Sequence, residues 1–133
     1  MIVADTNALI WFLEDLPALG RIARRLVEGA HAEDSLAASA FSFWEIAFLI
    51  GRNRLEIDVT ADEFRREALA FGIREIALTG DIGIAAVMLE GLHRDPADRI
   101  IVATALANDA TLITADRRLL GWAGLLKRHD ARL

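Results

Sequence analysis

The sequence predicts an α/β fold, a three-layer sandwich in which helices flank both faces of a central, mostly parallel sheet. Short apolar stretches typical of buried strands alternate along the chain with longer stretches of helical character. Parallel strands need a crossover between them, usually a helix, so this alternation favours right-handed strand–helix–strand units. The length of 133 residues, without a repeat, low-complexity tract or linker, favours a single domain over residues 1–133.

Five short segments are expected to form the sheet. Each is a mainly apolar run of a length usual for a buried strand, and the first ends directly at an aspartate. The predicted strands are 2–4, 36–39, 73–78, 111–114 and, as an edge strand in the C-terminal tail, 125–127.

Seven helices are expected between these strands. Thr60 with Glu63 is a capping-box signature, Thr79 is a second N-cap, and Asp95-Pro96 pairs a cap with a proline in the first helical turn. Pro17 likewise stands where a helix is expected to start. The predicted helices are 7–13, 18–28, 42–50, 61–71, 80–92, 97–108 and 116–120.

The composition excludes several classes of protein. There is no cysteine, which rules out disulfides, thiolate zinc sites and cysteine nucleophiles, and fits a reducing compartment. The longest stretch without a charged residue is ten residues, 35–44, whereas a membrane-spanning helix needs about 20. The first residues also lack the basic region of a signal peptide. We therefore expect a cytoplasmic protein that does not contact membranes.

The charge balance is acidic, with 15 basic and 20 acidic residues and a net charge of -5 at pH 7. This argues against a strongly basic surface for nucleic acid. Lys127 is the only lysine; arginines suit bidentate contacts with phosphate or carboxylate, although high-GC codon usage explains the same bias. A mean hydropathy of +0.32 is high for a small domain and indicates apolar surface that a partner covers.

Four acidic residues stand in unusual surroundings. Asp5 ends the first predicted strand, and Asp116 follows the strand 111–114 by two residues. In parallel α/β sheets ligands bind beyond the carboxyl ends of the strands, where both would lie. Glu45 is the only charge in a very apolar helix, and Asp98 lies in the first turn of its helix, ahead of an apolar run.

Each carboxylate also has a purely structural explanation. Asp5 and Asp116 could cap the helices that follow them. Asp98 would interact favourably with its helix dipole by about 0.3–1 kcal/mol. Glu45 is harder to explain, because so apolar a helix should be largely buried and an unpaired buried carboxylate costs several kcal/mol. The nearest following arginines are about two helical turns away.

Together, four carboxylates at one edge of the sheet would repel one another unless a cation lay among them. Mg²⁺ prefers such oxygen ligands, and Mn²⁺ also fits. Since the sequence has no Gly-rich phosphate loop, this arrangement predicts metal-dependent hydrolysis of a phosphodiester, with one or two ions activating water and stabilising the leaving oxygen.

The segments that carry these residues resemble a known family. The chain is similar to the PIN-domain ribonucleases, in particular to the VapC-type toxins of type II toxin–antitoxin modules. The similarity keeps the order of the family's motifs and extends over almost the whole chain. The matching segments are 2–7 (IVADTN), 39–47 (SAFSFWEIA), 95–103 (DPADRIIVA) and 112–116 (LITAD).

The resemblance implies a PIN-like fold and a Mg²⁺-dependent endoribonuclease. Its acidic quartet, both catalytic and metal-binding, would be Asp5, Glu45, Asp98 and Asp116. Small polar groups that orient the carboxylates would be Thr6, Asn7, Ser42 and Thr114.

The same resemblance implies an RNA substrate, a cognate antitoxin that blocks the cleft, and a homodimer. Asp95 would be a helix cap rather than a ligand. Ala97 departs from the pattern, because the toxins frequently have Phe at this position, and it would loosen the packing beside Asp98.

Several other polar and aromatic residues have more than one possible role. Arg99 either contacts RNA phosphate or pairs with a local carboxylate, and Arg52 and Arg54 either form an RNA-contacting rim or lie on a solvated loop. We do not expect a base or zinc-ligand role for the widely spaced histidines, which are His31, His93 and His129. The aromatic residues around Trp44 should be mostly core, with an excess that could form a groove for an amphipathic antitoxin helix.

Other functions fit parts of the pattern. A receiver-type phospho-acceptor domain is also α/β, but Asp5 has no acidic neighbour and Lys127 follows an uncertain strand. A haloacid-type phosphatase needs a second aspartate two residues after the first, and Asn7 occupies that position. A PIN-like interaction module without catalysis, or a PIN-like RNA-processing nuclease without a toxin role, is also compatible with the sequence.

Overall fold

The computed structural model describes residues 1–133 and contains one five-stranded sheet. Its strands are β1 (Ile2–Ala4), β2 (Leu36–Ser39), β3 (Arg74–Ile76), β4 (Thr111–Thr114) and β5 (Arg128–Asp130). The order in the sheet is β3-β2-β1-β4-β5, and every pair of neighbours is parallel. The sheet is thus fully parallel rather than mostly so.

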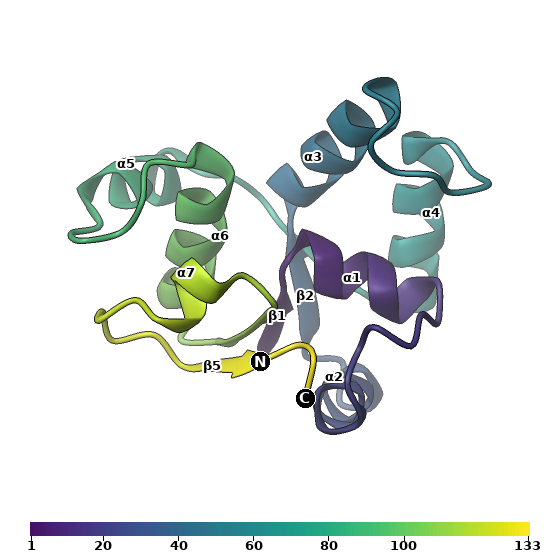
Figure 1. Ribbon diagram of the computed structural model, residues 1–133, viewed down its shortest axis with the longest axis horizontal. Coiled ribbons are helices and arrows are strands. Elements are labelled where there is room, and N and C mark those ends of the chain that lie inside the picture. The colour runs from purple at the N-terminus through teal and green to yellow at the C-terminus, as the bar shows by residue number, and fades with distance from the viewer.

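Helices lie on both sides of this sheet. They are α1 (Thr6–Leu13), α2 (Arg21–Ala32), α3 (Ala40–Gly51), α4 (Ala61–Phe71), α5 (Gly80–Met88), α6 (Pro96–Ala107) and α7 (Arg117–Leu120). Helices α1 to α4 contribute to the core on one face, and α6 and α7 to the core on the other, with α5 packed on α6 (Figure 1). The expected three-layer α/β sandwich is confirmed. None of these helices combines the length and the apolar character needed to cross a lipid bilayer.

Side chains alternate between the two faces along each strand. Ala4, Leu36 and Ile113 belong to the core beneath α1 to α4, whereas Val3 and Leu112 belong to the core beneath α6. Because both faces are covered, the strands are continuous apolar runs. This is why the sequence predicts β2 and β4 at their observed bounds.

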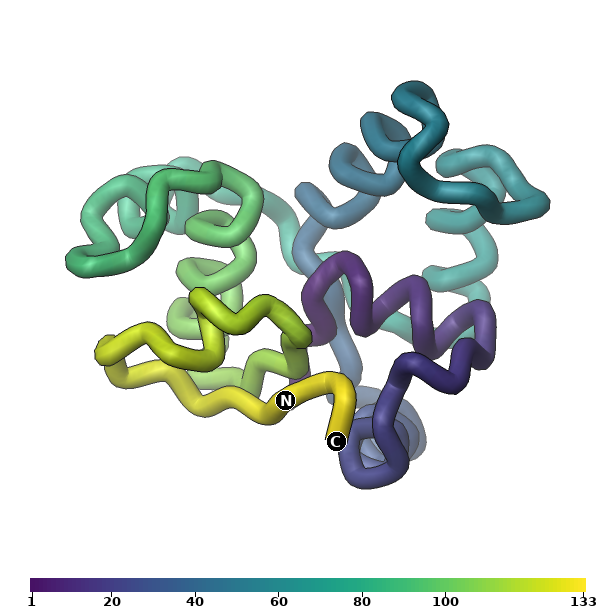
Figure 2. Tube along the Cα trace, in the orientation of Figure 1, coloured from purple at the N-terminus to yellow at the C-terminus, as the bar shows by residue number.

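The chain changes direction across the sheet after β3. From β1 it adds β2 and β3 on one side and then crosses to add β4 and β5 on the other. In Figure 2 the teal-to-green segment leaves α4 and reaches α5 on the opposite side of the sheet. The crevice beyond the carboxyl ends of β1 and β4 is therefore a topological switch point, the usual ligand site of such sheets.

Local capping signals are confirmed. The Thr60 hydroxyl caps α4 as predicted by accepting a hydrogen bond from Glu63 N (3.1 Å). The Glu63 carboxylate accepts from the Thr60 hydroxyl (3.2 Å) and not from the Thr60 backbone N–H, so the reciprocal bond of a capping box is not formed. Thr79 caps α5, and Asp95 caps α6, of which Pro96 is the first residue. These bonds are made within a few residues, so they can be predicted without knowledge of the fold.

The start of α2 and the ends of α5 and the sheet differ from the prediction. Helix α2 begins after its N-cap Gly20, so Pro17 lies in a turn and not at a helix start. Helix α5 ends at Met88 rather than at residue 92, since Leu89 is extended, and Arg99 donates to the free carbonyl groups of the last helical turn. The edge strand is 128–130 rather than 125–127, because a turn before it leaves Leu125 97% exposed.

Helix α3 is not largely buried, contrary to expectation. It begins at Ala40 because Ser39 caps it, and its buried residues are Ser42, Phe43 and Ile46. Trp44 is 55% exposed and Phe48 is 39% exposed. A helix that is apolar all round would normally be buried on all sides, so this exposed aromatic face requires an explanation of its own.

Candidate metal centre

The four predicted carboxylates line one hollow beyond the carboxyl ends of β1 and β4. Asp5 directly follows β1 and Asp116 follows β4, while Glu45 comes from α3 and Asp98 from the first turn of α6. The hollow has a volume of about 120 Å³. Its wall is completed by Thr6, Asn7, Leu49 and Ile101. The switch in strand order brings these distant segments together.

Asp5 is the most deeply placed of the four, with only 8% exposure. Its Oδ1 accepts from the backbone N–H of Ala8 (2.8 Å) and its Oδ2 from the hydroxyl of Thr114. Asp5 therefore caps α1 and lines the hollow at the same time. Burial raises its pKa to about 6, against the lowering effect of its two donors, and the nearby Asp98 and Asp116 raise it further.

Thr114 joins two of the carboxylates. Its hydroxyl donates to Asp5 and accepts from the backbone N–H of Asp116 (3.1 Å). Asp116 in turn caps α7 by accepting from the backbone N–H groups of Arg118 and Leu119. The strand end thus fixes the positions of both aspartates relative to one another.

Glu45 is half-buried and is held from α1. The Thr6 hydroxyl lies 2.6 Å from Glu45 Oε1 and is also hydrogen-bonded to Ser42 Oγ (3.0 Å). No arginine pairs with Glu45. Burial raises its pKa, the bond from Thr6 lowers it, and the charge of Asp98 raises it further.

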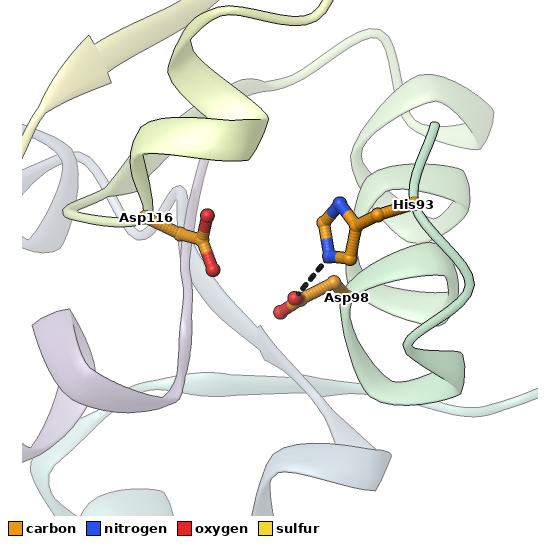
Figure 3. Close-up of side chains that lie close together, drawn as sticks. All are labelled: His93, Asp98 and Asp116. Atoms are coloured by element: carbon orange, nitrogen blue, oxygen red, sulfur yellow. Dashed lines mark hydrogen bonds and ion pairs between the residues drawn. The ribbon is translucent and has the colours of Figure 1, made fainter. Parts of the chain in front are cut away.

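His93 approaches the carboxylates from the loop before α6, a position that the sequence did not indicate. Its Nε2 lies 2.7 Å from Asp98 Oδ2, and one potential ligand atom from each of His93, Asp98 and Asp116 lies within 4.8 Å of the other two (Figure 3). Its Nδ1 is buried without a partner. Burial raises the pKa of Asp98, whereas the bond with His93 lowers it.

Arg118 is the second residue at the hollow that sequence reasoning missed. Its guanidinium lies 3.1 Å from Asp116 Oδ2 and 3.5 Å from Asp98 Oδ2. Burial alone would raise the pKa of Asp116, but the hydrogen bonds from Arg118 outweigh it and lower that pKa. The only sequence signals were short spacings: Arg118 is two residues after Asp116, and His93 is five before Asp98.

The predicted RNA-contacting arginines lie outside the hollow. The guanidinium of Arg99 is hydrogen-bonded to backbone carbonyl groups of α5 and of the loop after it, those of Ala86, Val87, Leu89, Leu92 and His93. Arg52 is exposed and lies over the ring of Phe48, 4.9 Å from its centroid. Arg54 is exposed on the loop after α3. Arg99 is thus engaged internally, whereas the other two are free to meet a ligand.

The donor set of the hollow suits a hard divalent cation. Three of its four carboxylates have raised pKa values, chiefly because burial disfavours the charged form and further because neighbouring carboxylates repel one another. Carboxylate oxygens are the ligands that Mg²⁺ prefers, and they also suit Mn²⁺. An ion there would relieve the repulsion among the carboxylates.

Comparison with known proteins defines the class of this protein. A sequence model of the PIN domain family matches residues 2–124, and the chain belongs to this family. The chain is 31% identical to Ribonuclease VapC22 of Mycobacterium tuberculosis over 119 residues, which are 89% of this chain and 88% of that protein. The resemblance to VapC-type PIN proteins is thereby confirmed.

Solved structures agree in fold. A DNA-bound VapBC from Salmonella typhimurium superposes with a TM-score of 0.68 at 14% identity, covering 97% of this chain and 96% of that one. VapBC2 from Rickettsia felis, bound to a DNA fragment from its promoter, has a TM-score of 0.67 at 17% identity, with 98% and 100% covered. At such identities the likeness concerns the fold alone.

Proposed function

We propose that this protein is a Mg²⁺-dependent endoribonuclease and the toxin of a toxin–antitoxin pair. The observation that carries the proposal is the single hollow lined by Asp5, Glu45, Asp98 and Asp116, whose shared charge calls for a cation. The identity of 31% to a ribonuclease over most of both chains supports RNA as the substrate.

The four carboxylates would hold one or two Mg²⁺ ions, with Mn²⁺ as an alternative. Such ions lower the pKa of water and stabilise the leaving oxygen of a phosphodiester. The chain's own polar groups hold the carboxylates in place: Thr114 fixes Asp5, Thr6 and Ser42 fix Glu45, and His93 fixes Asp98. At the mouth of the hollow, the Asn7 amide and the Arg118 guanidinium are suited to contact the phosphate.

A toxin of this kind would have protein partners. Several structural neighbours are toxin–antitoxin complexes, among them one from Klebsiella pneumoniae with a TM-score of 0.62. We infer a cognate antitoxin that covers the hollow, a homodimer, and a cytoplasmic location. Large apolar side chains exposed on α5 support coverage by a protein partner; Ile84 is 68%, Val87 75% and Met88 71% exposed.

The metal dependence is tested by removing the metal. Purified protein, freed of any antitoxin, should cleave RNA in Mg²⁺ or Mn²⁺ and stop when EDTA is added. Asp5→Asn and Asp98→Asn should each abolish cleavage, because each removes a ligand charge while the fold remains. Gel analysis of the products measures this. Wild-type rates in Asp5→Asn would refute the proposed mechanism.

The toxin role is tested separately in cells. Expression should arrest growth, and expression of a small protein encoded beside the gene should restore it. Asp98→Asn is the control and should not arrest growth. Cleavage in vitro without growth arrest would instead indicate an RNA-processing nuclease.

A further inference from the structure

We propose that a second hollow, beside the carboxylates, binds one unpaired nucleobase of the RNA and so positions the neighbouring phosphodiester for cleavage. We call it the base hollow. It lies between α3 and the start of α6, and its apolar lining is formed by Phe41, Trp44, Phe48, Leu49, Pro96 and Ala97. The inference rests on the proposed ribonuclease function and deepens it.

The base hollow is adjacent to the carboxylate hollow. Glu45 and Leu49 line both of them. The base hollow has a volume of about 350 Å³, within the range of small-ligand pockets, roughly 300–1,000 Å³. A strand with a phosphate at the carboxylates therefore has an adjacent nucleotide against the base hollow.

One wall is a column of stacked aromatic rings on α3. The ring centroids of Phe41 and Trp44 are 5.0 Å apart, and those of Trp44 and Phe48 are 5.1 Å apart, with interplanar angles of 19° and 12°. The rings support one another, and both Trp44 (55% exposed) and Phe48 (39% exposed) remain open to solvent. A base can pack against the exposed part of Trp44.

Polar groups at the rim fit a nucleotide. Arg54 lines the hollow, and Arg52 stacks on Phe48 at the end of the column, so both can meet phosphates that flank the bound base. Asp95 also lines the hollow and uses only its Oδ1 to cap α6, through Ala97 N. Its Oδ2 can accept a hydrogen bond from an amino group on the base. These charged groups favour a nucleotide over a purely apolar protein segment as the occupant.

The base must be unpaired. A base in a duplex is covered on both faces, whereas proteins that recognise RNA sequence insert splayed-out bases between aromatic and apolar side chains. The small side chain of Ala97, on α6, also lines the base hollow. A phenylalanine side chain at position 97 would occupy this space.

The experiment pairs a change in the protein with a change in the RNA. A short single-stranded RNA is cleaved by wild-type protein, and the cleaved bond is mapped. The same RNA is then made with an abasic ribose at either nucleotide beside that bond, and kcat/KM is measured for wild type and for Trp44→Ala. In wild type, removal of one of the two bases should lower kcat/KM by about 5- to 150-fold, the range for loss of a stacked base.

For the Trp44→Ala variant, kcat/KM for the abasic RNA should be close to kcat/KM for the intact RNA. The variant has already lost the contact with the base, so removing the base as well has little further effect. Ala97→Phe is the second variant, since it fills the hollow without removing a side chain, and it should also become insensitive to the missing base. Phe71→Ala is the matched control. Phe71 is a 52% exposed aromatic residue stacked on His31, away from both hollows, and its variant should keep the wild-type sensitivity.

Binding gives a readout independent of cleavage. In an Asp98→Asn background, the intact RNA should quench tryptophan fluorescence, and the abasic RNA or the added Trp44→Phe change should reduce the quenching. If removal of the base lowered kcat/KM by the same factor in wild type and in Trp44→Ala, the inference would be overturned. So would a Trp44→Ala variant that changes only the sedimentation of the protein, which would assign the surface to a second copy. Absence of cleavage of any RNA by wild type would instead overturn the proposed function.

Discussion

Two neighbouring residues on α6, Asp98 and Arg99, carry opposite charges and meet opposite surroundings. Arg99 points to the end of α5 and the loop after it, where five backbone carbonyl groups accept hydrogen bonds from its guanidinium. Asp98 points into the carboxylate hollow, where burial and the charges of Asp95 and Asp116 raise its pKa. The guanidinium of Arg99 is surrounded by acceptors, whereas the carboxylate of Asp98 has His93 and Arg118 beside it and still faces other carboxylates in the hollow.

On this one helix, Arg99 contributes to the stability of the protein and Asp98 to its proposed metal site. A guanidinium has five N–H donors, and the loop supplies an acceptor for each of its nitrogen atoms. Such a site holds the loop, including His93, at a fixed distance from α6. The carboxylate hollow instead accumulates like charges, which costs stability unless a cation binds. Variants of the two regions should therefore change stability in opposite directions.

The largest expected effect is that of Arg99→Ala. Loss of the guanidinium leaves several partly buried carbonyl groups without a donor, and we expect the free energy of unfolding to fall by about 3 kcal/mol. Urea denaturation followed by circular dichroism measures this. Arg94→Ala is the matched control, because Arg94 is exposed in the same loop and makes no side-chain hydrogen bond, and it should stay within about 0.5 kcal/mol. Equal losses in both variants would contradict the assignment of Arg99 as the anchor of the loop.

Asp5→Asn should do the opposite and stabilise the metal-free protein. The pKa of Asp5 is raised from 3.8 to about 6 in the folded state. The folded state then binds more protons than the unfolded state between these values, so the contribution of Asp5 to stability falls as the pH rises from about 4 to about 6. At pH 7 in EDTA the penalty is at most about 3 kcal/mol, which Asn would remove.

The sign of the effect is tested by comparing two pH values. The stability gain of Asp5→Asn should be large at pH 7 and small near pH 4, where Asp5 is protonated. Asp58→Asn, at an exposed position without a side-chain hydrogen bond, should change little at either pH. Addition of Mg²⁺ at pH 7 should stabilise wild type and so reduce the difference in free energy of unfolding between wild type and Asp5→Asn. A gain that is independent of pH would show that charge repulsion is not its cause.

Much of the fold could be predicted from the sequence because its signals are local. Strands β2 and β4 are covered on both faces and appear as apolar runs, and the Thr60 N-cap bond to Glu63 N is made within four residues. The placement of Asp5 and Asp116 follows from the same logic, since the carboxyl ends of adjacent parallel strands share one edge of the sheet.

The exposed face of α3 and the positions of several site residues could not be predicted, because they depend on tertiary contacts that sequence spacing does not encode. The aromatic pattern of α3 does not distinguish its buried face, with Ile46, from its exposed face, with Trp44, because both are apolar. Arg99 is adjacent to a carboxylate in sequence, yet the path of the α5–α6 loop turns it toward backbone carbonyls. His93 and Arg118 reach the hollow from loops or short helices whose positions only the tertiary fold determines.

The smallest effect should come from His93, which connects Arg99 to Asp98. The Arg99 guanidinium donates to the His93 carbonyl, and the His93 ring is hydrogen-bonded to the Asp98 carboxylate. His93→Ala should lower Mg²⁺ affinity and cleavage by about 10- to 100-fold, the range for partners of metal ligands. His93→Gln keeps an N–H donor and should retain most of both. Calorimetric titration of Mg²⁺ and initial cleavage rates measure the two quantities, with His31→Ala on α2 as the control. A Gln variant as impaired as Ala would mean that the imidazole acts directly, as a ligand or a proton carrier, rather than by positioning Asp98.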